Sequence, residues 1–129
     1  MAKILIVEDN ALNIKLFCDL LAAHGHEPEA VTDSRNALEA AQNFAPDLVI
    51  TDIQLPHVSG LELIRMLRSD EKLAEVPIMA VTAYSARGDE ERIRAAGAQA
   101  YVSKPISVVR FAQTVDELLA GKHEPVEQV

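Results

Sequence analysis

The sequence predicts an α/β fold, a doubly wound parallel sheet of five strands with five helices. Short apolar runs rich in β-branched residues alternate with segments of helical periodicity, which is typical of buried parallel strands and their crossover helices. Right-handed crossovers place such helices on both faces of the sheet. The 129 residues are the length of one domain with a sizeable core.

The first strand and the first helix follow one another directly. Lys3–Val7 is an unbroken apolar run and predicts a buried strand. The helix predicted over Leu12–His24 ends at Gly25, because glycine readily adopts the left-handed conformation that closes helices. Its apolar residues recur at helical spacing and share one face: Ile14, Phe17, Cys18 and Leu21.

A second and a third strand flank the next helix. Glu27–Val31 predicts a weaker strand. Asp33 and Ser34 can cap the helix that follows, and Pro46 stops it from continuing. The apolar run Asp47–Thr51 predicts the third strand. The helix between these strands turns four residues to one face: Ala37, Leu38, Ala41 and Phe44.

The middle of the chain predicts a loop, a helix and a fourth strand. Leu55–Gly60 is a loop that leads into a helix ending near Ser69. A polar linker, Asp70–Glu75, connects this helix to the strand Val76–Val81. The inward face of the helix comprises Gly60, Leu63, Ile64 and Leu67.

The last third predicts a short helix, a strand and a longer helix. After a loop at Ala83–Gly88, the charged helix Asp89–Ala96 has little apolar face, so we expect it to be lightly anchored. The fifth strand is Ala100–Ser103, which Pro105 ends. Ser107 can cap a final helix with these residues inward: Val108, Phe111, Ala112, Val115, Leu118 and Leu119.

Composition limits the function classes. The net charge of −8 has the wrong sign for attraction to nucleic acid. No apolar run approaches the roughly 18 residues of a membrane span, so we expect no membrane partner and a soluble, cytoplasmic protein. The one cysteine, Cys18, excludes an internal disulfide and fits core packing. We expect one domain over residues 1–121, a disordered polar tail over 122–129 and no output domain.

Polar residues stand where the predicted strands end. Glu8 and Asp9 follow the first strand, Asp52 the third, Thr82 the fourth and Lys104 the fifth. Ligands of open α/β sheets bind outside the carboxyl ends of the strands, so we expect these groups to converge there. Clustered carboxylates favour a hard cation such as Mg²⁺, and an added ammonium and hydroxyl suit a phosphoryl group. The set predicts phosphoryl transfer to a carboxylate, with either aspartate as the nucleophile.

These residues lie in motifs that resemble the receiver domains of bacterial two-component response regulators, over roughly residues 2 to 120. The resemblance implies a flavodoxin-like, CheY-like sheet in strand order 2-1-3-4-5. Within the family, Asn10–Asn13, Gly88–Arg94 and Lys104–Ser107 resemble a single-domain regulator of cell division and polarity. The family motifs are Val7-Glu8-Asp9-Asn10, Thr51 to Pro56 with Gly60, Val81-Thr82-Ala83, and Tyr101 to Pro105.

The resemblance implies roles for the site residues. Asp52 would be the phosphoacceptor and a metal ligand, and Lys104 would pair with the phosphoryl group. Asp9 would bind Mg²⁺ directly, Glu8 through water, and Gln54 through its backbone carbonyl. No organic cofactor is implied. The protein would catalyse its own phosphorylation and dephosphorylation without being a conventional metabolic enzyme.

The resemblance also implies a switch and partners. Thr82 would bond the attached phosphoryl group, and Tyr101 would follow into the vacated space. This would reshape the surface formed by the fourth helix, fifth strand and fifth helix, where a downstream signalling protein would bind. A histidine kinase or histidine phosphotransfer protein would supply the phosphoryl group in a phosphorelay. The Lys104–Pro105 peptide bond would be cis.

Other interpretations stay open at this point. Glu8 and Asp9 by themselves are also typical of helix-capping acids, Thr82 of a solvated strand end and Tyr101 of packing. The charged run Asp89–Arg94 suits a solvated face or a partner-binding face.

Alternative functions make distinct demands on the sequence. A stand-alone aspartyl-phosphate phosphatase or phosphotransferase would want a second aspartate where Gln54 stands. A nucleotide or flavin carrier would want a phosphate-binding loop after the first strand, which Asp9-Asn-Ala-Leu does not offer. A phosphate sink or a stress-signalling receiver would share the site and differ in its partners.

Overall fold

The computed structural model describes residues 2–83 and 87–121, and they form the predicted α/β architecture. All strand pairings are parallel, and the strand order is β2-β1-β3-β4-β5, as the resemblance implied. The strands are β1 (Lys3–Val7), β2 (Glu27–Val31), β3 (Leu48–Asp52), β4 (Ile78–Thr82) and β5 (Ala100–Ser103).

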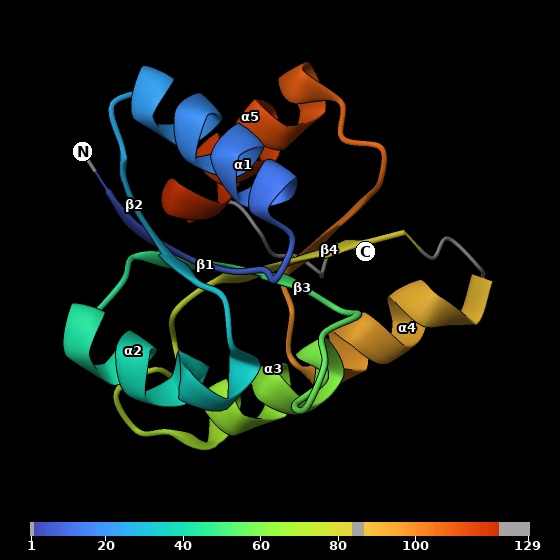
Figure 1. Cartoon of the computed structure of the whole chain (residues 1–129). Coiled ribbons are helices and arrows are strands. Elements are labelled where there is room, and N and C mark those ends of the chain that lie inside the picture. The colour runs from blue at the N-terminus through green and yellow to red at the C-terminus, as the bar shows by residue number, and fades with distance from the viewer. Residues whose placement is uncertain (1, 84–86, 122–129) are drawn as a thin grey trace.

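The helices cover both faces of the sheet. In Figure 1, α1 and α5 lie over one face, and α2, α3 and α4 lie over the other, which is the doubly wound arrangement. Their bounds are α1 (Ala11–Ala23), α2 (Ala37–Phe44), α3 (Gly60–Ser69), α4 (Arg87–Ala96) and α5 (Val108–Leu119), with a 3₁₀ turn at Ser34–Asn36 before α2.

Each face of the sheet has its own hydrophobic core, because successive strand residues point to opposite faces. Under α1 and α5, the Phe17 and Phe111 rings stack with centroids 5.3 Å apart. On the other face, Leu63 and Ile64 of α3 pack on β1 and β3 with no exposed surface. Every residue of β3 is buried, as expected for a central strand, whereas β2 is an edge strand with mostly exposed residues.

The caps are partly as predicted. The Ser107 hydroxyl accepts a hydrogen bond from the Arg110 amide and caps α5. Asp33 also acts as a cap, but for the 3₁₀ turn, where it accepts from the Arg35 amide at 2.9 Å. The predicted cap at Ser34 is wrong, because its hydroxyl bonds to a distant loop.

Three expectations about packing are corrected. The polar linker contains Leu73, which is 2% exposed and belongs to the core. The charged helix α4 is anchored after all, through Ile93 and Ala96, both of which are buried. Val108 was expected to face inward but is 49% exposed, because the inward face of α5 begins at Phe111.

The predicted start of the charged helix at Asp89 is wrong, because α4 begins at Arg87. The Lys104–Pro105 peptide bond is cis. Among the helices formed by the described residues, none is long and apolar enough to cross a membrane. The central part of the predicted loop at 83–88 and the predicted tail at 122–129 lie outside the residues that the structure describes.

Candidate functional site

The site forms at the carboxyl ends of the central strands. Asp52 and Thr82 are the last residues of β3 and β4, and Glu8 directly follows β1. Main-chain hydrogen bonds continue beyond the strands, with Glu8 N donating to the Val31 carbonyl at 3.1 Å and Lys104 N donating to the Thr82 carbonyl at 2.8 Å. The sheet therefore holds the backbones of Glu8, Asp52, Thr82 and Lys104, which fixes where their side chains begin.

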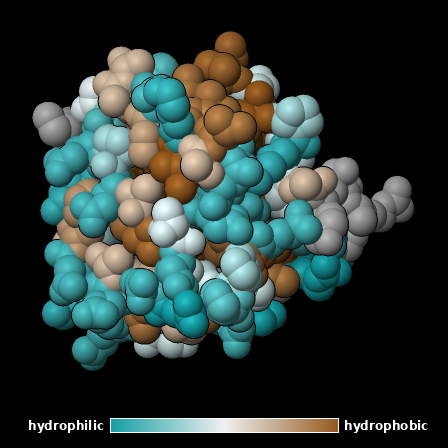
Figure 2. Space-filling model, viewed as in Figure 1, coloured by the Kyte–Doolittle hydropathy of each residue, from teal (hydrophilic) through white to brown (hydrophobic). Residues whose placement is uncertain are grey.

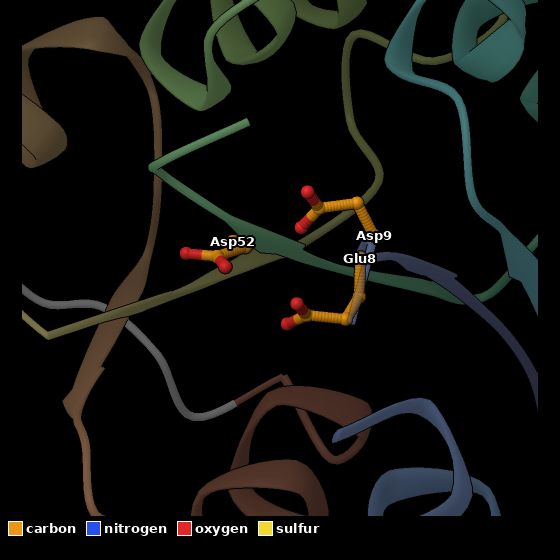
Figure 3. Close-up of side chains that lie close together, drawn as sticks. All are labelled: Glu8, Asp9 and Asp52. Atoms are coloured by element: carbon orange, nitrogen blue, oxygen red, sulfur yellow. The ribbon is translucent and has the colours of Figure 1, made fainter. Parts of the chain in front are cut away.

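The structure brings the three predicted carboxylates together. Glu8, Asp9 and Asp52 each offer a carboxylate oxygen, and these three atoms lie within 4.8 Å of one another. Figure 3 shows the carboxylates turned toward the same side. Glu8 is 1% exposed and Asp52 is 4% exposed, whereas Asp9 is exposed at the rim. Helix capping does not explain the burial of Glu8, because the residue that caps α1 is Asn10, whose Oδ1 accepts from Asn13 N at 3.0 Å.

Lys104 supplies the positive charge closest to these acids. Its Nζ donates to Asp52 Oδ2 at 3.0 Å and lies 3.6 Å from Glu8 Oε1, which is an ion-pair distance but too long for a hydrogen bond. Among the described residues, Lys104 is the one cation within ion-pair distance of Glu8 and Asp52, so the cluster of three carboxylates retains negative charge. Buried charge of this kind is costly unless a further cation or a proton compensates it.

The surroundings of Glu8 also indicate that the cluster needs a further cation or a proton. Glu8 Oε2 accepts a hydrogen bond from Asn10 N at 3.1 Å, while Oε1 is buried without a hydrogen-bond partner among the described residues. Burial, followed by repulsion from Asp52, raises the pKa of Glu8. A hard divalent cation would satisfy the orphaned oxygen and the clustered charge, so this donor set fits Mg²⁺.

The loop after β3 contributes backbone groups to the site. Gln54 N donates to Asp52 Oδ1 at 3.2 Å, so the main chain of Gln54 lies beside the Asp52 carboxylate. The Gln54 side chain is exposed. The same loop contains His57, which is exposed and has φ 72°.

Gly60 allows α3 to begin directly against Asp52. A Cβ atom at Gly60 would lie 2.2 Å from the Asp52 carbonyl oxygen and 2.5 Å from the Ile53 Cα atom, closer than real contacts permit. The glycine belongs to the motif in the sequence, but its contact with Asp52 is evident only in the folded chain. Its absence of a side chain is thus a requirement of the site.

Thr82 and Tyr101 occupy different environments. Thr82 is fully buried at the end of β4. The alternative interpretation of this residue as a solvated strand end is therefore wrong. Tyr101 is partly buried and packs against the core on the α2–α4 side of the sheet. The parallel register pairs Asp52 with Val81, the residue before Thr82, and this keeps Thr82 near the Asp52 end of β3.

Ser34 is a residue near the site whose contacts sequence reasoning missed. It is 2% exposed, and its hydroxyl donates to the Pro56 carbonyl at 2.8 Å and accepts from Val58 N at 3.1 Å. No local pattern could reveal these contacts, because the partners lie 22 and 24 residues away. The only sequence signal was a serine beside the capping residue Asp33.

Comparisons with known proteins agree with this geometry. The model of the response regulator receiver domain family matches residues 4–116. The polar-differentiation response regulator DivK of Brucella ovis is 52% identical over 116 residues, which cover 90% of this chain and 94% of the relative.

Solved structures show the same fold. Chemotaxis response regulator CheY4 of Vibrio cholerae superposes with a TM-score of 0.86 at 27% identity, covering 92% of this chain and 98% of that one. The receiver domain of sensor histidine kinase PA1611 from Pseudomonas aeruginosa, solved with a magnesium ion coordinated in its active-site cleft, superposes with a TM-score of 0.85 at 29% identity, with the same coverage.

Proposed function

The chain belongs to the response regulator receiver domain family, and we propose that it accepts a phosphoryl group on Asp52 and signals through phosphorylation-dependent protein binding. One observation carries the proposal. The buried Asp52 carboxylate is held at 3.0 Å by Lys104 and faces the carboxylates of Glu8 and Asp9 at the carboxyl edge of the sheet. A nucleophile, an ammonium and a cation-binding group thus lie together.

The chemistry is a transfer between two side chains. A carboxylate oxygen of Asp52 attacks the phosphorus of a phosphohistidine on a histidine kinase or phosphotransfer protein. The new P–O bond forms as the P–N bond breaks, and the electron pair of that bond returns to the imidazole of the donor. Lys104 already contacts Asp52 Oδ2, so its ammonium is positioned to pair with a phosphoryl oxygen as negative charge arrives.

We assign the metal to the acidic cluster. Asp9, Asp52 and the Gln54 carbonyl would be direct ligands of Mg²⁺, and Glu8 would act through water. When bound, the ion neutralises charge on the transferring phosphoryl group. The magnesium in the related receiver domain of PA1611 supports this choice of metal.

We propose that the readout runs from Thr82 to Tyr101. The Thr82 hydroxyl would bond the new phosphoryl group, and Tyr101 would move inward and alter the surface formed by α4, β5 and α5. A downstream signalling protein would bind there. The 52% identity to DivK supports a role in cell polarity or cell-cycle control.

Exposed apolar residues support a protein as the phosphoryl donor. Leu12 is 79% exposed and Val109 is 67% exposed, and both lie in the first turns of helices that begin beside the site. Figure 2 shows hydrophobic surface gathered over the α1 and α5 region. A donor protein that brings its phosphohistidine to Asp52 would cover this surface, whereas a small-molecule substrate would leave it bare.

The test combines phosphorylation with metal binding. Asp52→Asn is expected to abolish labelling by acetyl phosphate in the presence of Mg²⁺, because a neutral amide is a much weaker nucleophile than a carboxylate. Asp9→Ala is expected to weaken Mg²⁺ binding at least about tenfold. Asp19→Asn is the matched control, because Asp19 is exposed on α1 and pairs only with Lys15 among the described residues. Labelling of Asp52→Asn would show that another residue is the acceptor.

A further inference from the structure

The loop between β3 and α3 carries the Gln54 main chain, and its two ends are fixed by backbone hydrogen bonds. Ile53 N donates to the Val81 carbonyl at 3.1 Å, and Gly60 N donates to the Ile53 carbonyl at 2.9 Å. These bonds tie the loop to β4 and close it on itself. They leave the middle of the loop, residues 55–58, to be held by something else.

The hydroxyl group of Ser34 fixes that middle part. It donates to the Pro56 carbonyl at 2.8 Å and accepts from Val58 N at 3.1 Å. The hydroxyl thus binds the residues directly before and after His57. Within residues 2–83 and 87–121, these are the only hydrogen bonds that join residues 55–58 to another segment of the chain. One side chain therefore connects the β2–α2 loop to the loop at the site.

The conformation of the loop makes such support necessary. His57 has φ 72°, in the left-handed region that is unfavourable for a non-glycine residue. A strained residue of this kind persists when its surroundings hold it in place. The two part-buried bonds of the Ser34 hydroxyl, on a side chain that is 2% exposed, hold the chain on both sides of His57.

Ser34 is not needed for its own local structure. The 3₁₀ turn that it begins is capped by Asp33, which accepts from the Arg35 amide and also pairs with the Arg35 guanidinium. The Ser34 hydroxyl directs its one donor and one of its acceptor positions at the loop after β3. This is the arrangement expected of a group that orients metal ligands without binding the metal.

We propose that Ser34 is a positioning residue of the phosphorylation site, which holds the Gln54 carbonyl in place for Mg²⁺ by fixing residues 55–58. The inference rests on the proposed function of the acidic cluster. It adds the β2–α2 loop to the parts of the chain on which metal affinity depends.

Ser34→Ala removes both hydrogen bonds and provides the main test. In a Mg²⁺ titration followed by amide NMR shifts, its Kd is expected to rise about tenfold. At saturating Mg²⁺, labelling of Asp52 by acetyl phosphate is expected to return to within about twofold of the wild-type rate, because the nucleophile is untouched. Ser59→Ala is the matched control, since its hydroxyl caps α3 by accepting from Glu62 N and makes no bond to another segment among the described residues.

A second readout needs neither metal nor activity. In metal-free protein, the Val58 amide is expected to exchange its hydrogen at least about tenfold faster in Ser34→Ala than in wild type or Ser59→Ala, because its acceptor is gone. Ser34→Cys retains the approximate volume and weakens both bonds, so it is expected to lie between wild type and Ser34→Ala. This variant keeps the test decisive if alanine perturbs folding.

The outcomes separate the inference from the proposed function. If wild type binds no Mg²⁺ and Asp52 takes no label, the proposed function fails. If wild type does both and Ser34→Ala matches Ser59→Ala in Mg²⁺ affinity, the positioning role of Ser34 is overturned. Unchanged Val58 exchange in Ser34→Ala would overturn the structural step on which that role depends.

Discussion

At the residue scale, two buried carboxylates share a single ammonium. Glu8 and Asp52 are almost fully removed from solvent, yet only Lys104 faces them with positive charge within ion-pair distance among the described residues. A domain built only for stability would gain from replacing such a group by apolar side chains. The cost is understandable if the cluster is completed by a cation and a phosphoryl group during function.

Gly60 gives a prediction at the same scale. Gly60→Ala is expected to lower the free energy of unfolding by about 2 kcal/mol, because the new Cβ would overlap the Asp52 carbonyl oxygen and the Ile53 Cα atom. It should also slow phosphorylation of Asp52 at least about tenfold, since the acceptor backbone must shift. Urea unfolding followed by circular dichroism and labelling by acetyl phosphate measure the two effects.

The control for Gly60 is Gly25→Ala. Gly25 has φ +84°, and a Cβ atom there would meet nothing within 4 Å, so alanine strains the backbone without touching the site. Stability should fall by about 1 kcal/mol while phosphorylation stays unchanged. Equal labelling rates in the two variants would contradict the requirement for glycine at position 60.

At the scale of elements, α4 and β5 are the proposed receivers of the signal. Loading with beryllofluoride, a phosphoryl mimic, is expected to change amide hydrogen exchange over residues 87–109 and to leave α2 unaffected. Thr82→Val keeps the buried shape and removes the hydroxyl, so it should bind the mimic while losing at least about half of that change. An undiminished change in Thr82→Val would assign the coupling to another group.

The first turns of α1 and α5 give a second prediction at this scale. Replacing Leu12, which is 79% exposed, by lysine should slow phosphotransfer from a histidine kinase that labels the wild type, because an apolar docking contact is lost. Labelling by acetyl phosphate is the internal control and should not change, since this donor is too small to reach α1 and the site together. If labelling by both donors falls equally, the substitution has damaged the phosphorylation site itself and not a docking contact.

At the scale of the whole molecule, Arg68 links segments far from the site. Its guanidinium donates to the Val76 carbonyl at 2.7 Å, the Gly97 carbonyl at 2.9 Å and Gln99 Oε1 at 2.6 Å. It also donates to the Ala74 carbonyl at 3.1 Å. The C-terminal part of α3 is thereby joined to the segments that precede β4 and β5.

Arg68→Met is expected to lower the free energy of unfolding by about 3 kcal/mol, because several part-buried carbonyls lose a charged donor together. Arg65→Met, on an exposed position of the same helix, should change it by less than about 0.5 kcal/mol. Urea unfolding of the two variants provides the comparison. A difference between them below about 1 kcal/mol would show that the Arg68 bonds add little to stability.

Features that depend on local sequence patterns could be predicted, whereas contacts between distant parts of the chain could not. The strands and helices were found because apolar periodicity is local, although β4 begins at Ile78 instead of Val76. Leu73 was missed because a single apolar residue in a polar linker has no periodic partners. The anchoring of α4 was underestimated for a related reason, since Ile93 and Ala96 suffice once α3 lies beside them.

The sequence by itself determined the fold class and the set of polar residues at the strand ends, since both follow from local patterning and from the geometry of parallel sheets. The tertiary structure alone decided which groups touch. It set the 3.0 Å contact of Lys104 with Asp52, the close approach of Gly60 and the bonds from Ser34 to the loop after β3. These contacts join residues distant along the chain, and only the packing of helices on the sheet brings them within bonding distance.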